Sequence, residues 1–197
     1  MRVHDENYPL QTIGYMNVKD AAQLLGTAVP ADTGGTWADL GAGEGTFTLA
    51  LAGLLGASAR VYAVDRDEGA LGELERRAVE HEVRNRITPV IADFTMPFEP
   101  PGERLDGMLF ANSLHFVRSA DAVLNRLVQW MRPGARVVFV EYDRRPASRW
   151  VPYPVDAERL PAICAAAGLT TPMKTGARPS DYGGELYVAF ATVEPTS

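Results

Sequence analysis

The residues best suited to bind a ligand lie in a glycine-rich segment near position 41. The stretch Asp39-Leu-Gly41-Ala-Gly43-Glu-Gly45 places glycine at alternate positions, after an apolar run and before a segment of helical period. Glycine lets the backbone turn sharply and lets a ligand approach without a Cβ in the way. The first turn of a helix offers free N–H groups to a polar or anionic group. The spacing therefore predicts a ligand-binding loop between a strand and a helix, with an ordinary tight turn as the alternative.

Three more polar residues, Asp65, Asp93 and Asn112, end or directly follow later apolar runs. Ligands of open α/β sheets bind at the carboxyl ends of the strands, so we expect these side chains to meet at one edge. Asp65 stands at about the distance from Gly41 at which dinucleotide-binding folds carry a ribose-binding acid, and a carboxylate there can accept hydrogen bonds from both hydroxyls. The alternative is that Asp65 caps the next helix, a role for which Asp67 competes.

The elements that must position these residues follow from the hydrophobic pattern. Runs rich in Val, Leu and Ile predict strands at Trp37–Leu40, Val61–Asp65, Thr88–Ile91, Leu105–Ala111, Arg136–Glu141 and Leu186–Val193. Apolar residues at helical spacing predict helices at Val18–Leu25, Thr46–Leu55, Asp67–Glu82, Ala120–Met131 and Asp156–Ala167. This alternation predicts an α/β protein with a three-layer, doubly wound (Rossmann-like), mostly parallel sheet.

The end of the chain departs from that alternation. A weak strand at Thr170–Lys174, a loop at Thr175–Gly184 rich in Gly and Pro, and the strong last strand follow one another without a helix. Strands joined in this way pair antiparallel, so we expect seven strands with an antiparallel C-terminal strand inserted into or beside the sheet. We predict one domain at 36–197, preceded by an N-terminal arm or cap at 1–35.

Composition narrows the function. The formal net charge of −6 argues against a protein that grips nucleic acid by charge. A single cysteine, Cys164, excludes an intramolecular disulfide and a multi-thiolate metal site, and we predict no metal. The N-terminus has no apolar signal core and no segment is long enough to span a membrane, so we expect a cytoplasmic protein without membrane contact.

The ordered set of the glycine loop, Asp65, Asp93 and Asn112 resembles the class I S-adenosylmethionine-dependent methyltransferases. The resemblance covers about residues 36–141, and the C-terminal strand pair agrees with it in topology. It implies an enzyme that transfers a methyl group from S-adenosylmethionine to an O, N or C atom by in-line displacement, leaving S-adenosylhomocysteine.

The resemblance also implies how the cofactor is held. The glycine loop passes its methionine part, Asp39 helps to hold the ammonium group, and Asp65 binds the ribose. Asp93 bonds the adenine amino group, and Phe94 lies beside the ring or serves as an ordinary core aromatic. The implied cofactor contacts are Asp39, Gly41, Gly43, Glu44, Asp65, Arg66, Asp93, Phe94 and Asn112.

Catalytic residues are harder to identify, because methyl transfer needs a general base only when the acceptor does not lose its proton unaided. His115 and Tyr142 are the candidates, since both follow predicted strands on the side where a substrate would lie. The alternative for both is an ordinary packed or solvated loop residue. The cluster Arg144, Arg145 and Arg149 could hold an anionic substrate, and the apolar stretch Trp150–Val155 could form a pocket wall; a solvated charge run and a plain connection are the alternatives.

The small, acidic chain favours a small-molecule acceptor, with nucleic acid and protein acceptors as open alternatives; the oligomeric state is not predicted. A non-catalytic, S-adenosylmethionine-binding regulatory protein is a second reading. A nicotinamide-dependent oxidoreductase is a third and weaker one, because Thr46 stands where the dinucleotide fingerprint has its third glycine.

Overall fold

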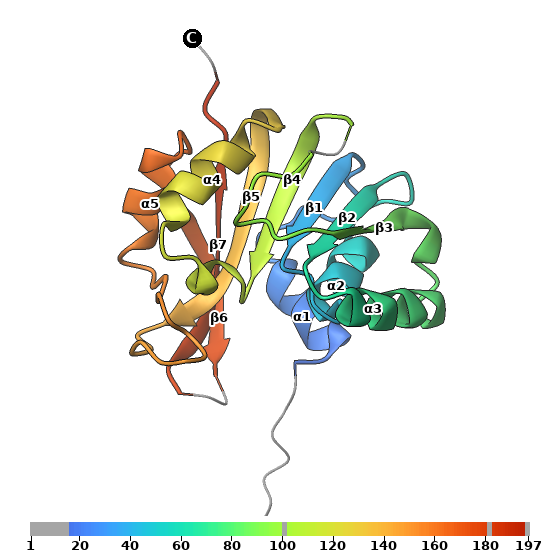
Figure 1. Cartoon of the computed structure of the whole chain (residues 1–197), viewed down its shortest axis with the longest axis horizontal. Coiled ribbons are helices and arrows are strands. Elements are labelled where there is room, and N and C mark those ends of the chain that lie inside the picture. Colours follow the sequence, from blue (N-terminus) through green and yellow to red (C-terminus); the bar gives the residue numbers. More distant parts are fainter. Residues whose placement is uncertain (1–15, 100–101, 181–182, 196–197) are drawn as a thin grey trace, which may run out of the picture.

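The computed structural model of the chain describes residues 16–99, 102–180 and 183–195, which form one seven-stranded sheet (Figure 1). Its strands are β1 (Thr36–Leu40), β2 (Arg60–Asp65), β3 (Ile87–Ile91), β4 (Leu105–Ala111), β5 (Met131–Asp143), β6 (Met173–Pro179) and β7 (Glu185–Thr192). The order across the sheet is β3-β2-β1-β4-β5-β7-β6. Strand β7 is antiparallel to both β5 and β6, and the other pairs are parallel. The predicted fold class is confirmed.

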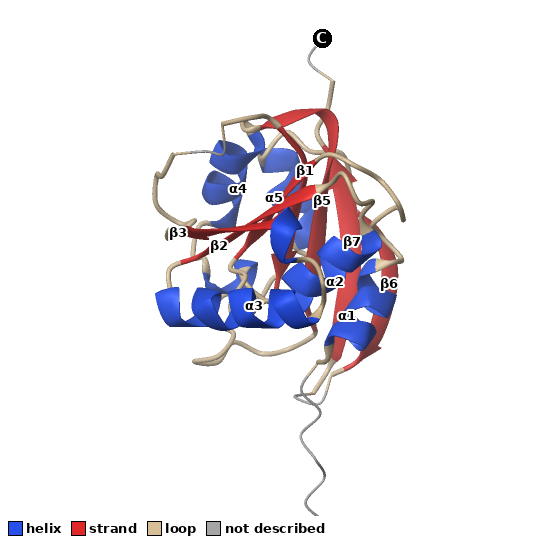
Figure 2. Cartoon of the chain, turned by 90° about the vertical axis from the view of Figure 1, so that its right-hand side faces the viewer, coloured by secondary structure: helices blue, strands red, loops and turns tan. Residues whose placement is uncertain are grey.

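Helices cover both faces of the sheet (Figure 2). They are α1 (Val18–Leu25), α2 (Thr46–Leu54) and α3 (Glu68–Glu80) on one face, and α4 (Ala120–Val128) and α5 (Leu160–Ala166) on the other. Two short 3-10 turns, η1 (Arg84–Arg86) and η2 (Leu114–Phe116), complete the set. Within the described ranges, none of the helices has the length and apolar character needed to cross a bilayer.

Each face of the sheet has its own hydrophobic core. Leu49, Leu51 and Leu74 pack on the side of α1–α3, and Leu124 and Leu127 pack on the side of α4 and α5. Every residue of β1 is buried, as expected for a central parallel strand covered on both faces. Helix α1 belongs to the first core, so the described part of the predicted arm packs onto the domain; residues 1–15 lie outside the described residues.

The prediction of a loop at Thr175–Gly184 is wrong for its first half, because β6 runs from Met173 to Pro179. Strand β6 is the outer strand of the sheet and pairs only with β7. Most of its residues are partly or fully exposed, so it carries no continuous apolar run to signal a strand. Pro179 is tolerated because edge strands and strand ends lose little when an N–H donor is missing.

Two other boundaries moved for identifiable reasons. Helix α5 begins at Leu160, not at Asp156, with Pro161 in its first turn and Asp156 accepting a hydrogen bond from the Arg159 N–H (2.8 Å) in the turn before it. Strand β5 begins at Met131, not at Arg136, because the residues between these two positions form an irregular bulge within the strand. Gly134, at φ +77°, lies in that bulge.

Candidate functional site

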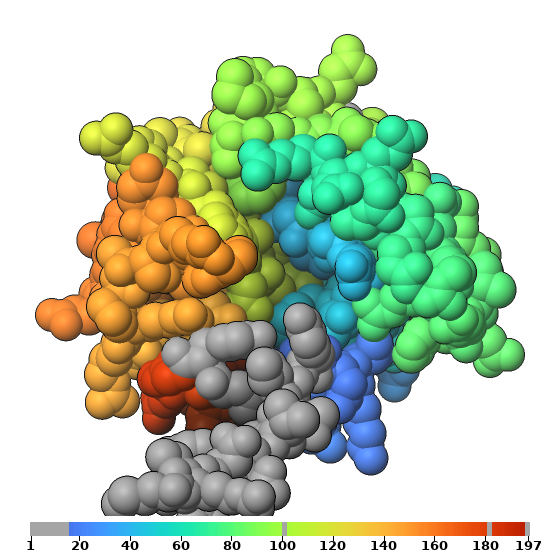
Figure 3. Space-filling model, turned by 60° about the horizontal axis from the view of Figure 1, so that its bottom comes forward, coloured from blue at the N-terminus to red at the C-terminus, as the bar shows by residue number. Residues whose placement is uncertain are grey.

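A cavity of about 500 Å³ lies at the carboxyl ends of the parallel strands. It is lined by Gly41, Gly43, Asp65, Arg66, Asp67, Ala70, Ala92, Asp93, Phe94, Thr95, Asn112, Ser113 and Phe116. Figure 3 views the molecule from this end and shows a hollow between the segments after β2 and β3 and the segment that follows β5. The structure thus brings together the predicted cofactor residues except Asp39 and Glu44.

The three glycines of the loop all have positive φ, and each has its own physical reason. A Cβ on Gly41 would lie 2.6 Å from the Ser113 Cβ, and a Cβ on Gly45 would lie 2.4 Å from the Leu74 side chain. A Cβ on Gly43 would meet nothing within 4 Å, because this residue faces open space at the cavity. Two glycines therefore permit close packing, and the third leaves room for a ligand.

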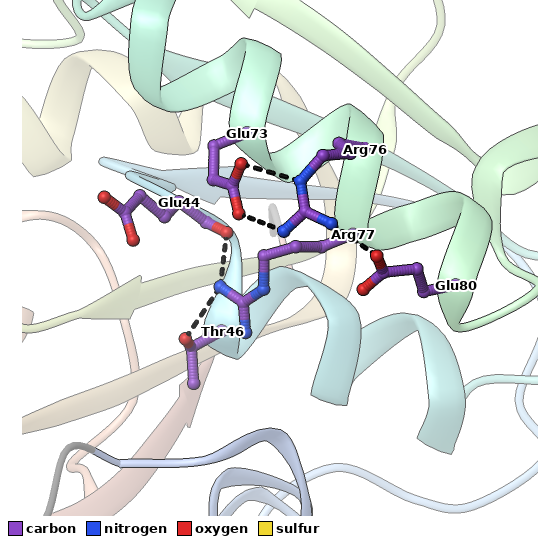
Figure 4. Close-up of polar contacts among 6 residues, drawn as sticks. All are labelled: Glu44, Thr46, Glu73, Arg76, Arg77 and Glu80. Atoms are coloured by element: carbon purple, nitrogen blue, oxygen red, sulfur yellow. Dashed lines mark hydrogen bonds and ion pairs between the residues drawn. The ribbon is translucent and has the colours of Figure 1, made fainter.

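Helix α3 holds the glycine loop from outside the cavity (Figure 4). Arg77 donates hydrogen bonds to the Glu44 carbonyl oxygen (2.7 Å) and to Thr46 Oγ1 (3.2 Å). The Glu44 side chain is exposed and points away from Arg77, so this residue is tied in through its backbone only. The neighbouring Arg76 pairs with Glu73 and Glu80 on its own helix and does not reach the loop.

Asp65 links the glycine loop to the start of α3. Its Oδ2 accepts a hydrogen bond from the Gly43 N–H (2.7 Å), and its Oδ1 accepts one from the Asp67 N–H (2.9 Å). The helix cap is Asp67, whose Oδ1 accepts from the Ala70 N–H (3.1 Å), so the capping alternative for Asp65 is wrong. A carboxylate offers about four lone-pair sites, which leaves acceptor capacity on the cavity side of Asp65.

The residues after β3 form the next part of the wall. Asp93 Oδ1 accepts hydrogen bonds from the Thr95 N–H (2.9 Å) and hydroxyl (2.6 Å), and Arg66 lies 4.0 Å from its Oδ2. The Thr95 hydroxyl lowers the pKa of Asp93 against the effect of partial burial, which keeps this carboxyl ionised. Phe94 packs edge-on against Phe110 (5.9 Å between centroids), as expected for a core aromatic, and it also lines the cavity.

Among the described residues, three buried side-chain oxygens near these strand ends have no hydrogen-bond partner: Asp39 Oδ1, Asn112 Oδ1 and Ser113 Oγ. The other oxygen of Asp39 accepts from the Thr48 hydroxyl (2.6 Å). Burial raises the pKa of Asp39 to about 7, the bond from Thr48 opposes that shift, and the charge of Asp65 adds to it. Buried acceptors without donors are costly, so this region suits a ligand that brings hydrogen-bond donors.

His115 and Tyr142 do not line the cavity, although Phe116, which follows His115, does. His115 is 2% exposed, and its Nδ1 lies 2.6 Å from Oε2 of the fully buried Glu141. The other Glu141 oxygen accepts from the N–H groups of Leu114 and His115 (2.9 and 3.3 Å). The Tyr142 ring centroid lies 5.7 Å from that of His115. The histidine is thus packed and fixed by a carboxylate.

Glu141, the partner of His115, was not predicted as a functional residue, although its position carried a signal. Glu141 ends an apolar run in the same way as Asp65 and Asp93 do. The cavity residues that were not predicted are Asp67, Ala70, Ala92, Thr95, Ser113 and Phe116, which are close in sequence to predicted ones. No group of three or more His, Cys, Asp or Glu side chains suited to a metal ion occurs in the part of the chain that the structure describes.

The fold and the cavity together define a nucleoside-cofactor-binding α/β protein with an added antiparallel strand. Residues 38–134 match the sequence model of a family described as a methyltransferase domain. A search among curated proteins finds no match. The matched stretch is a methyltransferase domain, and the sheet order of the described chain is that of the class I S-adenosylmethionine-dependent methyltransferases. S-adenosylmethionine is the cofactor that such a domain uses.

Solved structures share the fold at low sequence identity. An S-adenosylmethionine-dependent methyltransferase from Aquifex aeolicus is 15% identical, with 88% of this chain and 89% of that chain covered and a TM-score of 0.68. The 1,6-didemethyltoxoflavin-N1-methyltransferase of Burkholderia thailandensis, solved with its substrate and S-adenosylhomocysteine, is 21% identical, with coverages of 90% and 78% and a TM-score of 0.67. The 4+2 cyclase SpnF is 16% identical, with coverages of 89% and 81% and a TM-score of 0.71.

Proposed function

We propose that this protein methylates a small molecule, with S-adenosylmethionine bound in the cavity at the strand ends. One observation carries the proposal: acids and glycines predicted from separate stretches of sequence converge on one cavity of about 500 Å³. Structural neighbours described as a 1,6-didemethyltoxoflavin-N1-methyltransferase and a mitomycin 7-O-methyltransferase support a small acceptor. The acidic net charge of −6 supports it over nucleic acid.

In this proposal each part of the cofactor meets a matching part of the wall. Asp65 accepts the ribose hydroxyls with the lone pairs that its two backbone bonds leave over. Asp93 accepts from the adenine amino group, Phe94 lies beside the ring, and Arg66 stands at the exposed rim. The unpartnered oxygen of Asn112, which lines the cavity, accepts from the ammonium group, and the buried Asp39 supports this end of the site from behind the cavity wall. Glu44 contributes through the loop shape that its carbonyl helps to fix.

S-adenosylmethionine supplies a sulfonium whose methyl carbon is open to in-line attack. The chain's own task is to hold the acceptor atom in line and to exclude water, which can supply ~7–11 kcal/mol of the barrier. For an acceptor that must lose a proton, we propose His115 as the general base; its ring is buried and outside the cavity wall, so this role requires the ring to become accessible when the acceptor binds. Glu141 accepts only, so Nδ1 carries the hydrogen and Nε2 keeps its lone pair for the acceptor's proton. Tyr142 packs beside this histidine.

Calorimetric titration with S-adenosylmethionine, S-adenosylhomocysteine and NAD tests the cofactor assignment. We expect both sulfur compounds to bind and NAD not to bind. Asp65→Ala should weaken S-adenosylhomocysteine binding by roughly 1–3 kcal/mol, the cost of leaving buried polar groups unpaired. Asp121→Ala, which removes an exposed acid outside the cavity, is the matched control. Binding of NAD alone would sink the proposal.

A second candidate is a protein that binds the cofactor without transferring its methyl group. The likeness to a structure described as a cyclase favours keeping this alternative, because that fold is not restricted to one reaction. Conversion of S-adenosylmethionine to S-adenosylhomocysteine in the presence of a panel of hydroxylated and aminated small molecules separates the two. Turnover with any acceptor supports methyl transfer, and tight binding without turnover across the panel supports the second candidate.

A further inference from the structure

The segment between β5 and α5 projects beside the cavity as a hydrogen-bonded turn. Ser148 and Val151 exchange backbone hydrogen bonds (3.1 and 3.2 Å), which leaves Arg149 and Trp150 at the tip of a tight turn. Val151 and Val155 are each 1% exposed, and the Tyr187 hydroxyl donates to the Val155 carbonyl oxygen (2.8 Å). We call residues 148–153 the tip hairpin. The buried side chains of Val151 and Val155 anchor it to the domain.

The tip hairpin is tied directly to the wall of the cofactor cavity. The Tyr153 N–H donates a hydrogen bond to the His115 carbonyl oxygen (2.9 Å), and the next residue, Phe116, lines the cavity. In Figure 3 the orange segment that contains this hairpin borders the hollow on the side opposite α3. A molecule placed against the hairpin would therefore lie next to the cofactor.

Aromatic side chains are exposed around this junction. Trp150 is 62% exposed, Phe116 is 53% exposed and Tyr153 is 36% exposed. Single exposed aromatics are common, but contiguous exposed apolar groups beside a cavity mark ligand-binding surfaces. Phe116 lines the cavity, and the Tyr153–His115 hydrogen bond holds the tip hairpin beside it, so these exposed rings border the cavity. We call Phe116, Arg149, Trp150 and Tyr153 the aromatic shelf.

Positive charge accompanies the aromatic rings. The Arg149 guanidinium lies over the Trp150 ring (4.4 Å to the centroid), and Arg145 lies over the Tyr142 ring (4.6 Å). Stacking leaves the N–H edge of a guanidinium free to bind a carboxylate with two parallel hydrogen bonds. Among the described residues Arg144 forms an ion pair with Glu185 (3.5 Å), whereas no described ion pair includes Arg149.

We propose that the aromatic shelf is the methyl-acceptor site and that it selects a flat aromatic acceptor bearing a carboxylate. The ring of the acceptor stacks among Phe116, Trp150 and Tyr153, and the carboxylate pairs with Arg149. This inference rests on the proposed function, because it places the acceptor beside a bound cofactor. Although the net charge of the protein is −6, Arg149 supplies a local positive charge where the carboxylate of the acceptor binds.

The test measures binding of hydroxybenzoates and hydroxycinnamates to the full chain saturated with S-adenosylhomocysteine, by calorimetry. We expect at least one of these acids to bind, and its neutral amide to bind at least fivefold more weakly. Arg149→Gln and Trp150→Ala should each weaken the acid at least fivefold and leave S-adenosylhomocysteine affinity unchanged. Arg144→Gln is the matched control, since Arg144 already pairs with Glu185.

The possible failures are distinguishable. Absence of S-adenosylhomocysteine binding would defeat the proposed function and not the shelf in particular. Normal binding of S-adenosylhomocysteine, with no aromatic acid bound or with acid binding unaltered in Arg149→Gln and Trp150→Ala, overturns the shelf proposal alone. A short single-stranded oligonucleotide serves as a further probe; if it binds through Arg149 and Trp150 while the acids do not, the acceptor is a nucleic acid and the proposal is wrong.

Discussion

Asp39 carries the most unusual electrostatics of any single residue at the site. It is 1% exposed, one of its oxygens has no hydrogen-bond partner, and burial raises its pKa to about 7. In the unfolded chain the same carboxyl ionises near its ordinary value of 3.8. Between about pH 4 and pH 7 the unfolded state therefore loses a proton that the folded state keeps. Stability from this residue is present at low pH and is lost as the pH rises through 7.

Asp39→Asn should remove that dependence, because asparagine keeps the shape and does not titrate. We expect wild-type stability, measured relative to Asp39→Asn, to fall by roughly 1.4 kcal/mol per pH unit at most between pH 5 and 7 and then to level off. Urea unfolding of both proteins at pH 5, 6, 7 and 8 measures this. Asp121→Asn, at an exposed site, should follow the wild type; parallel curves for wild type and Asp39→Asn would refute the assignment.

The kcat of variants at His115 tests whether this residue acts as the general base. If Nε2 takes the acceptor's proton, His115→Gln lowers kcat by about 10²–10⁴-fold, the usual contribution of a general base. S-adenosylhomocysteine affinity should stay unchanged, because His115 does not line the cavity. Glu141→Gln should alter the pH dependence of kcat, since Glu141 sets the histidine tautomer. An unchanged kcat in a folded His115→Gln protein would leave His115 with a packing role only.

Individual site residues were predictable where a polar side chain ends an apolar run. Asp65, Asp93 and Asn112 follow this rule, and all three line the cavity. The pairing of His115 with Glu141 was not predictable, because 26 positions separate two residues that only the neighbouring strands β4 and β5 bring together. The local sequence predicts which polar side chain lies at the end of a strand. Whether two such side chains meet depends on which strands are neighbours in the sheet.

At the scale of elements, α3 acts on the glycine loop through one arginine. Arg77→Ala removes two hydrogen bonds to the loop, to Glu44 and Thr46, without touching the cavity itself. We expect S-adenosylhomocysteine affinity to fall about 3–10-fold, which corresponds to the loss of roughly one hydrogen bond. Calorimetric titration measures this loss.

Arg76→Ala is the control on the same helix, because Arg76 pairs only with Glu73 and Glu80 on the exposed face. Its affinity for S-adenosylhomocysteine should match the wild type. Equal losses in the two variants would mean that helix stability, and not the reach of Arg77, controls the loop.

Some helices and strands can be predicted from their own residues, and others cannot. The helix at Val18–Leu25 and the strand at Leu105–Ala111 were predicted with the observed bounds. The helix has one clear apolar face, and every residue of the strand except Asp106 is buried. Strand β6 was not predicted beyond its first residues, because an edge strand is stabilised by pairing with β7 and carries Gly176 and Pro179. A buried helix or strand can be predicted from its own apolar residues, whereas the formation of an edge strand depends on pairing with the neighbouring strand.

In the whole molecule the cavity occupies only one part of the sheet. Its lining comes from the ends of β1, β2, β3 and β4, the turns that follow them and the start of α3, whereas β6 lies at the far edge of the sheet and does not line the cavity. A ligand stabilises a state by its preferential binding, about 2.7 kcal/mol at a hundredfold excess over Kd. The ligand suppresses only those local unfolding events that disrupt its binding site. Local unfolding confined to β6, at the far edge of the sheet, continues at its own rate.

Ligand binding should therefore slow hydrogen exchange around the cavity and leave exchange in β6 unchanged. Saturating S-adenosylhomocysteine should slow exchange up to about 100-fold at amides around the cavity, such as the Gly43 N–H that Asp65 holds. Amides of β6 should exchange as in the free protein, because that edge can open while the cavity stays intact. Equal protection of both regions would show that β6 opens only when the whole sheet unfolds, and the seven strands would then form a single cooperative unit.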